Sequence, residues 1–394
     1  MSERNSKNIF LIDGVRTPIG SLFKGLKGVS AVELAATTIK EIVRRQALNP
    51  AWVEQVILGN TVSAGTGQNL SRQAAVASGL PVSTPAFTVN HVCGSGLQSV
   101  VLATQAIKAG DCRLIAAGGT ENSSQNPFIV RRYHPENITT TDLKDSMILD
   151  GLWCEMTDAH MGELAEFLAE EYHITRGQQD QYALESHRKA CLAQEANKFT
   201  GEIIGIPLKG GEILKRDERP RKDIDLEKLM HLPPAFKKEG GSVTAGNSCI
   251  PCDGAGCVVV ASAPAVKEYK LKPKAKILGY ASVAVAPRLV FTAAISAIRE
   301  CLKKCGLFLK DIDLFEISES FAVQSIVTQS QLKIPEGKMN IFGGDVALGH
   351  PLGAAGTRIL ITLMHALHDQ KKKRGLAAVC LGGGGGVAMV IEKV

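Results

Sequence analysis

Aromatic residues are scarce in this chain: they make up 5% of the 394 residues, and only two are tryptophan. Charged residues are 21%, and their net excess of +6 is too small to indicate a nucleic-acid-binding protein. The longest uncharged stretch, 375–391, contains five consecutive glycines and falls short of the roughly 18 apolar residues that a membrane span needs. The composition therefore excludes fibrous, disordered and membrane-spanning classes and favours a globular chain of two or three domains.

Disulfide frameworks and secretion signals are also missing from the pattern. The ten cysteines are scattered, and residues 1–7 lead directly into the short apolar run 9–12 without a signal-peptide pattern. We therefore expect free thiols and a cytoplasmic protein. Cys249 and Cys252 have a spacing typical of metal or redox sites, but no second pair completes a zinc ribbon, so no metal is expected.

Short apolar strands alternate with helical patterns in the first and last thirds of the chain. The first third predicts strands at 9–13, 55–59 and 114–117 and helices at 31–46 and from Gly94. The last third predicts strands at 277–285, 314–317, 376–379 and 387–391 and helices at 293–305, after Ser320 and from Ala354. This alternation predicts an α/β fold with a mainly parallel sheet and an internal duplication.

Each half presents a reactive side chain where a strand leads into an apolar helix. Cys93 precedes small residues at 94–96, so the start of the following helix favours its thiolate; a small buried apolar cysteine is the alternative. His350 lies in a segment of glycines and proline, where an imidazole accepts a thiol proton or donates to an oxyanion. A helix-capping core histidine is the other interpretation.

Cys380 ends an apolar strand and is followed by glycines at 382–386, whose backbone N–H groups can form an oxyanion hole. A dinucleotide-binding loop is excluded because the glycines lead into a strand and not a helix. Ser318 follows another strand, where helix capping alone explains a serine. We expect the polar segment 121–247 to be an insertion that contacts substrate, with its basic stretch 209–222 either a solvated loop or a phosphate-binding rim.

In their order along the chain, these segments resemble the thiolase family of acyl-CoA C-acyltransferases. The resemblance covers nearly the whole chain and rests on the segments 13–18, 67–68, 72–74, 90–96, 118–121, 145–147, 160–162, 244–247, 253–255, 349–351 and 380–384. It implies duplicated αβαβα halves that form a five-layered core. The N-terminal half is expected at 1–120 plus 248–275, the loop domain at 121–247 and the C-terminal half at 276–394.

The resemblance also implies a role for each reactive residue. Cys93 takes the acyl group from a thioester, His350 activates it, and Cys380 exchanges a proton with the α-carbon of the second acyl-CoA. The backbone amides of Cys93 and Gly382 hold one oxyanion, and His350 helps to hold the other, with Ser318 at the family's asparagine position. Thioester exchange and Claisen condensation both need such nucleophile, base and oxyanion groups.

Substrate contacts follow from the same resemblance. Coenzyme A and acyl-CoA are expected as substrates, with no tightly bound cofactor, and Arg221 is expected near the nucleotide. Met161, Phe321 and Cys249 are expected to contact the acyl group or the pantetheine arm. The family further implies a homodimer or homotetramer without a nucleic-acid or membrane partner.

Three positions depart from the family pattern. Ser318 stands where the family has an asparagine that fixes a water for the enolate-forming step, Cys249 where many relatives have serine, and 291–294 where a glycine-proline segment is common. These departures leave two alternatives beside a thiolase that makes or cleaves 3-oxoacyl-CoA. One is a related enzyme with a different acceptor, and the other is a noncatalytic acyl-CoA-binding paralogue.

Overall fold

The computed structural model describes residues 8–131 and 139–394. The start of the expected N-terminal half, residues 1–7, and residues 132–138 of the expected loop domain lie outside the described residues. A large sheet runs through the molecule in the order β14-β15-β16-β13-β1-β12-β5-β3-β4. Its strands in the N-terminal part are β1 (Ile9–Arg16), β3 (Gln55–Gly59), β4 (Ala86–Val89), β5 (Leu114–Asn122) and β12 (Cys252–Ser262), with the short β2 (Gly20–Ser21) paired to β12. The C-terminal part supplies β13 (Ala275–Ala284), β14 (Leu314–Ile317), β15 (Arg374–Leu381) and β16 (Gly385–Lys393).

The same pairing pattern occurs in both parts of the sheet. In the first, β1–β12 and β12–β5 are antiparallel, while β5–β3 and β3–β4 are parallel. In the second, β13–β16 and β16–β15 are antiparallel, β15–β14 is parallel, and a parallel bridge from Phe315 to Met339 takes the place of the last strand. The internal duplication predicted from the sequence is therefore present in the topology.

The expectation of a mainly parallel sheet is wrong. Antiparallel pairs predominate at the centre, because β16 returns beside β15 through the tight glycine turn 382–384 and no crossover helix separates them. β12 likewise returns from the polar insertion and lies antiparallel between β1 and β5. Alternation of strands and helices predicted the elements, but β16 follows β15 through a turn without a helix, and β12 follows a long insertion whose path the alternation does not report.

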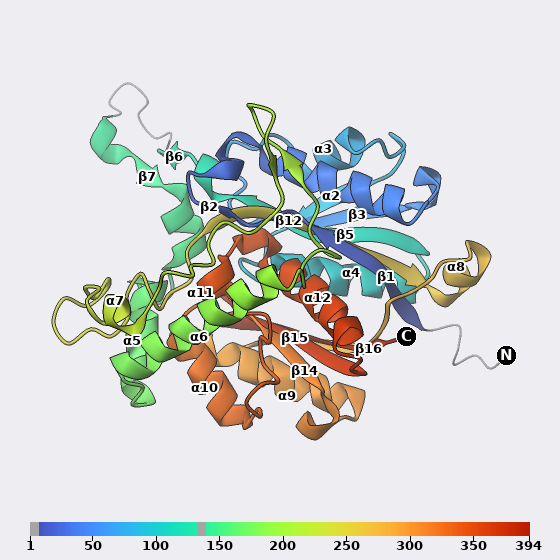
Figure 1. Cartoon of the computed structure of the whole chain (residues 1–394). Helices are drawn as coiled ribbons and strands as arrows, with labels where there is room; N and C mark the ends of the chain where they lie inside the picture. Colours follow the sequence, from blue (N-terminus) through green and yellow to red (C-terminus); the bar gives the residue numbers. More distant parts are fainter. Residues whose placement is uncertain (1–7, 132–138) are drawn as a thin grey trace.

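Helices cover this sheet in layers (Figure 1). α2 (Ala31–Arg45) and α3 (Leu70–Ala77) lie on the outer face of the first half, and α9 (Ala293–Cys305) and α10 (Ala322–Leu332) on that of the second. α4 (Ser95–Ala109) and α12 (Leu352–Asp369) pack against each other between the two halves. Three large apolar clusters fill the spaces between these layers, which gives the five-layered αβαβα arrangement.

The two central helices approach each other closely at glycines. A Cβ atom added to Gly96 of α4 would lie 2.5 Å from Thr357 Oγ1, and one added to Gly356 of α12 would lie 2.5 Å from the backbone nitrogen of Leu97. Larger side chains at these positions would force the helices apart. The contact therefore fixes the amino-terminal ends of α4 and α12 near each other, one carrying Cys93 and the other His350.

The polar insertion packs mainly on the C-terminal half. Its helices are α5 (Met161–Glu171), α6 (Arg176–Glu195) and α7 (Leu226–Met230), and α6 contacts α10 and the short α11 (Asp345–Leu348). Among the described residues, three two-stranded sheets complete it: β6 (Phe128–Ile129) with β7 (Lys144–Asp145), β8 (Trp153–Cys154) with β9 (Ala159–His160), and β10 (Ile206–Pro207) with β11 (Ile213–Leu214). α8 (Ala263–Glu268) follows β12.

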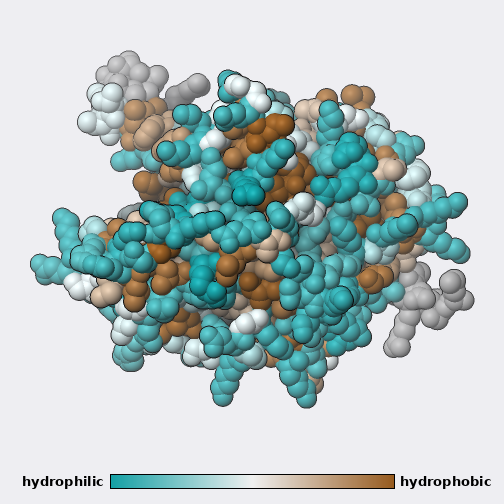
Figure 2. All heavy atoms as spheres, viewed as in Figure 1, coloured by the Kyte–Doolittle hydropathy of each residue, from teal (hydrophilic) through white to brown (hydrophobic). Residues whose placement is uncertain are grey.

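The surface is mainly hydrophilic on the face shown in Figure 2, with apolar patches between the charged side chains. Among the helices in the described parts of the chain, none combines the length and the apolar character that a membrane crossing requires. The exact limits of the three expected domains remain predictions. The strand before the insertion, β5, extends to Asn122, and the strand after it, β12, begins at Cys252.

Candidate active site

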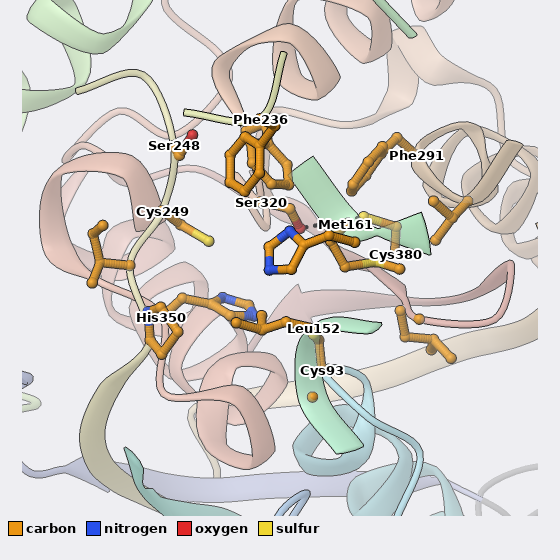
Figure 3. A pocket seen from close by; sticks show the side chains of 18 of the residues that line it. Cys93, Leu152, Met161, Phe236, Ser248, Cys249, Phe291, Ser320, His350 and Cys380 are labelled. Carbon is orange, nitrogen blue, oxygen red and sulfur yellow. Dashed lines mark hydrogen bonds between the residues drawn. The ribbon is translucent and has the colours of Figure 1, made fainter. Parts of the chain in front are cut away.

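A cavity of about 190 Å³ opens at the amino-terminal ends of α4 and α12 (Figure 3). Cys93, His350 and Cys380 all line it, although they lie far apart in the sequence. The residues of the sequence-predicted site that line the same cavity are Cys93, Met161, Cys249, Phe321, His350, Cys380 and Gly382, whereas Ser318 and Arg221 do not. The fold thus brings most of the predicted site residues into one space.

Cys93 is presented by a strained turn. The preceding residue, Val92, has φ +47°, a left-handed conformation that a β-branched residue rarely adopts. Hydrogen bonds hold it there: the Val92 N–H donates to Asn90 Oδ1 at 3.0 Å, and its carbonyl accepts from Ser95 Oγ at 2.6 Å and Thr61 Oγ1 at 3.1 Å. This turn leaves the Cys93 thiol partly exposed at the start of α4, where it lines the cavity.

His350 is buried between Gly349, whose φ of +97° requires glycine, and Pro351. Its Nδ1 lies 3.1 Å from Asp345 Oδ2, while its buried Nε2 has no hydrogen bond of normal geometry among the described residues. Burial lowers the pKa of His350, but Cys93 and Asp345 outweigh burial and raise that pKa to about 10. The ring is therefore suited to hold the proton that a Cys93 thiolate has released.

Cys380 occupies a different environment at the end of β15. Burial raises the pKa of its thiol to about 12, partly offset by Ser320, whose Oγ lies 3.5 Å from Cys380 Sγ. Cys380 consequently retains its proton at neutral pH and becomes a strong base once the proton has left. Two cysteines in one cavity are thereby suited to different tasks, one as a nucleophile and the other as a proton donor and acceptor.

The glycine turn after β15 packs directly on the Cys93 turn. A Cβ atom at Gly94 would lie 2.5 Å from Leu381 Cδ2, and one at Gly382 would lie 3.5 Å from Val92 Cγ1. Gly384 has φ +89°, and a Cβ there would meet the Val285 carbonyl oxygen at 2.5 Å. The two backbone amides predicted to hold an oxyanion, those of Cys93 and Gly382, therefore belong to turns in contact.

Apolar and aromatic side chains form the wall opposite the reactive groups. Phe291 and Phe321 meet edge to face with ring centroids 5.2 Å apart, Phe236 lies 6.3 Å from Phe321, and His160 stacks on Phe236 at 4.8 Å. Met161 at the start of α5 lines the same wall. Such a wall binds an acyl chain by removing apolar surface from water.

Ser318 is placed behind the cavity. Its Oγ donates a hydrogen bond to Asp345 Oδ2 at 2.6 Å, and the side chain is fully buried. Its role as an oxyanion donor stays a prediction. Asp345 is not among the residues predicted from the sequence. Its position five residues before His350, at the start of the same glycine-flanked segment, was a usable signal.

Arg221 and the basic stretch lie outside the cavity. The Arg221 side chain is exposed and pairs with Asp223 at 3.4 Å, while its backbone N–H donates to His187 Nδ1 at 3.2 Å. Cys249 lines the cavity, and burial raises its pKa well above the ordinary value. Within residues 8–131 and 139–394, no group of three or more potential metal ligands is arranged around one point.

Comparisons with known proteins give a consistent result. The sequence profile of the thiolase N-terminal domain matches residues 9–264, and that of the thiolase C-terminal domain matches residues 271–393. A probable acetyl-CoA acyltransferase from Staphylococcus aureus is 43% identical over 390 residues, covering 98% of this chain and 99% of the relative. The match to a Staphylococcus epidermidis protein of the same description is 42% identical and covers 98% of each chain.

Solved structures are similar over the same length. The acetyl-CoA acetyltransferase of Bacillus anthracis is 37% identical with a TM-score of 0.95, covering 98% of this chain and 99% of that one. Human mitochondrial 3-ketoacyl-CoA thiolase in complex with CoA is also 37% identical with a TM-score of 0.95, covering 99% of each chain. A thiolase from Ascaris suum in complex with coenzyme A is 39% identical with a TM-score of 0.93, covering 98% of this chain and 100% of that one.

The raised pKa of His350 predicts a titration that depends on Cys93. Once it has taken the Cys93 proton, the wild-type ring keeps it at pH 7 to 9 and loses it as the pH rises through about 10. In Cys93→Ala, the attraction of the thiolate is gone, so the ring loses its proton at lower pH. Nuclear magnetic resonance of histidine-labelled protein measures this, with His187, whose pKa burial and nearby arginines lower to about 4, as an internal control. An unchanged His350 titration in the variant would contradict the assignment.

Proposed function

Because the chain belongs to the thiolase family and is an acyltransferase with thiolase activity, we propose that it transfers acyl groups through a thioester on Cys93. The reaction is the reversible Claisen condensation of two acyl-CoA molecules or the cleavage of 3-oxoacyl-CoA by CoA. The observation that carries the proposal is the convergence of Cys93, His350 and Cys380 on one apolar cavity. Nothing observed favours a different acceptor or a noncatalytic paralogue.

The first step is acylation of Cys93. The thiol proton passes from Sγ to Nε2 of His350, and the thiolate attacks the thioester carbonyl. The backbone amides of Cys93 and Gly382 stabilise the resulting oxyanion. The departing CoA sulfur takes the proton of the Cys380 thiol, which is left as the thiolate, while His350 keeps its proton on Nε2. The apolar wall supports this step, because electrostatic interactions with the oxyanion are stronger where water is excluded. The amino terminus of α4 supports it as well, because the helix dipole favours negative charge there.

The second step joins or separates two carbons. In the condensation direction, Cys380 as thiolate removes a proton from the α-carbon of the second acyl-CoA, and the enolate attacks the acyl group on Cys93. His350 helps to hold the enolate oxygen, and Ser318 contributes through its bond to Asp345. The high pKa of the Cys380 thiol supports this role, because a base of that strength can take a weakly acidic carbon proton.

Coenzyme A enters as a substrate and leaves as a product, and we propose no tightly bound cofactor. The pantetheine arm would pass Cys249 and reach the cavity, with Met161 and Phe321 against the acyl group. Arg221 and the basic stretch 209–222, which lie outside the cavity, suit the anionic nucleotide. Two similar thiolase structures are complexes with coenzyme A, which supports this placement.

We also propose a cytoplasmic location, and a role in fatty acid metabolism because the proposed substrates are acyl-CoA thioesters. A homodimer or homotetramer is supported by two exposed apolar features. β4 is the last strand of the sheet and exposes Phe87, and apolar side chains near β6 and β7, including Phe128 and Leu143, are also exposed. Unpaired edges and apolar patches of this kind are common sites of self-association.

Removal of the nucleophile tests the proposed function. Cys93→Ala is expected to lower thiolysis of acetoacetyl-CoA and longer 3-oxoacyl-CoAs by at least about 10³-fold, because no other thiol replaces the acyl acceptor. Turnover is followed with CoA as cosubstrate, and the Cys93 peptide is analysed by mass spectrometry for an acyl adduct. Cys112→Ala, a partly exposed cysteine that does not line this cavity, is the matched control and should keep full activity.

The outcomes separate the alternatives. Turnover that survives in Cys93→Ala would overturn the proposal. An acyl adduct on wild-type Cys93 without thiolysis would instead indicate a different acceptor, and binding of acyl-CoA with neither adduct nor turnover would indicate a noncatalytic paralogue.

Phe291 is expected to limit the acyl chain. Its ring is buried in the cavity wall, so Phe291→Ala makes room for additional methylenes. Two further methylenes buried at about 0.8 kcal/mol each would raise kcat/KM for an eight-carbon substrate roughly tenfold relative to acetoacetyl-CoA. Thiolysis rates across chain lengths measure this ratio, with Phe308→Ala, an exposed phenylalanine, as control. A ratio unchanged by Phe291→Ala would remove Phe291 from the acyl pocket.

The assembly is tested by hydrodynamics. Sedimentation velocity of the wild-type chain should give a dimer or tetramer, and Phe87→Asp should shift it toward the monomer, because a charge on the edge strand disfavours pairing. Val82→Asp, at a more exposed apolar position outside β4, serves as control. A wild-type monomer at micromolar concentration would contradict the assembly.

A further inference from the structure

The carboxylate of Asp345 lies directly behind the imidazole of His350. It opens α11 and is fully buried, and its Oδ2 lies 3.1 Å from His350 Nδ1. The same oxygen accepts hydrogen bonds from Ser318 Oγ at 2.6 Å and the Glu319 N–H at 3.2 Å, while Oδ1 pairs with Arg358. Every partner of this carboxylate is a donor, so its position and its negative charge are fixed together.

This arrangement selects one tautomer of the imidazole. Because the carboxylate only accepts hydrogen bonds, Nδ1 must carry a proton to donate to it. In the neutral ring, the lone pair then resides on Nε2, the buried nitrogen for which the described residues supply no hydrogen bond of normal geometry. The nitrogen that faces the cavity is therefore the one able to take a proton.

The surrounding charges keep Asp345 ionised. Burial raises its pKa, but the Arg358 guanidinium and His350 outweigh burial and hold that pKa well below the ordinary value. On the other side of Arg358, Glu316 lies 3.5 Å away, and burial raises its pKa to about 8, so it is mostly protonated at pH 7. Arg358 is thus left to balance Asp345.

We propose that Asp345 is the positioning residue of His350, which it holds in the tautomer that accepts the Cys93 proton, with Ser318 and Arg358 orienting the carboxylate. The step is a proton transfer: the S–H bond of Cys93 breaks, an N–H bond forms at His350 Nε2, and the electron pair stays on sulfur. Asp345 keeps its own charge throughout. The inference rests on the proposed acylation of Cys93, and it gives Ser318 a function other than the water-holding one of the family's asparagine.

Other titratable groups also face His350, and none of them can replace Asp345. On the cavity side these are the thiols of Cys93, Cys249 and Cys380. Arg219 lies beside Gly349, and Cys252 donates its backbone N–H to the His350 carbonyl. The Glu319 carboxylate is turned away, because it accepts from Tyr182, Ser186 and Asn340.

Asp345→Asn tests the proposal with almost no change in volume. Arg358 only donates, so the amide oxygen must face it and the NH₂ group faces His350, which forces the proton from Nδ1 to Nε2. We expect the rate of Cys93 alkylation by iodoacetamide at pH 7 to fall about tenfold. The whole pH profile of the rate should shift upward by about one pH unit, so that the rate recovers as the pH is raised. In thiolysis, kcat should fall about 10²-fold with KM little changed.

The matched control is Asp13→Asn. Asp13 is an equally buried carboxylate that pairs with Lys274 at 2.5 Å and accepts from the Gly14 N–H, away from the cavity. Its removal should affect thermal stability without moving the pH profile of Cys93 alkylation. Since alkylation needs no acyl-CoA and no turnover, it separates this inference from the proposed function.

A second variant decides the matter if Asp345→Asn does not fold. Ser318→Ala removes one donor to Asp345 but keeps the carboxylate, and it should shift the alkylation profile in the same direction by about twofold to threefold. Wild-type pH profiles in a folded Asp345→Asn, or in Ser318→Ala when Asp345→Asn is unfolded, would overturn the proposal. So would an equal loss of alkylation at every pH, which would indicate a structural role alone.

Discussion

The backbone contact between α4 and α12 is the constraint on which the rest of the site depends. Two helices approach this closely only where no side chain separates them, and Gly96 and Gly356 supply that space. Because the two helices come from different halves of a duplicated chain, their contact joins the halves as well as the reactive residues. The site is thus a product of the interface between repeats, and neither repeat contains it alone.

The cavity differentiates side chains of the same kind by their surroundings. Cys93 lies partly exposed at a helix amino terminus, whereas Cys380 is buried at a strand end, and burial raises the pKa of Cys380 to about 12. Among the buried acids, Asp345 stays ionised beside Arg358, while Glu316 on the far side of that arginine is mostly protonated. Position in the fold therefore sets the protonation states of Cys380, Asp345 and Glu316.

The sequence was sufficient to predict the elements and most of the residues around the cavity. The helix Ala293–Cys305 and the strand Leu314–Ile317 have the predicted limits, because apolar periodicity and flanking glycine or polar residues define both. Sheet direction was not predictable in the same way, because β16 returns beside β15 through a tight turn and β12 returns beside β5 after a long insertion. Periodicity reports burial, and it does not report the path of a connection.

Side-chain partners were the part that the sequence did not supply. Ser318 was compared with the family's asparagine by position alone, yet its hydroxyl bonds to Asp345, which lies 27 residues later in the chain. The shape of the acyl wall has the same origin, since Phe236, Phe291 and Phe321 come from three separate segments. Such contacts depend on packing between elements, for which a single sequence has no local signal.

The place of β1 in the sheet has a consequence for synthesis of the chain. This first strand pairs with β12 on one side and, over Ile9–Leu11, with β13 on the other. During translation it has no strand partner until residues 252–277 have left the ribosome, about two thirds of the way through the 394-residue chain. Such late, nonlocal pairing slows folding. The apolar amino-terminal strand must therefore be kept from pairing with other chains in the meantime.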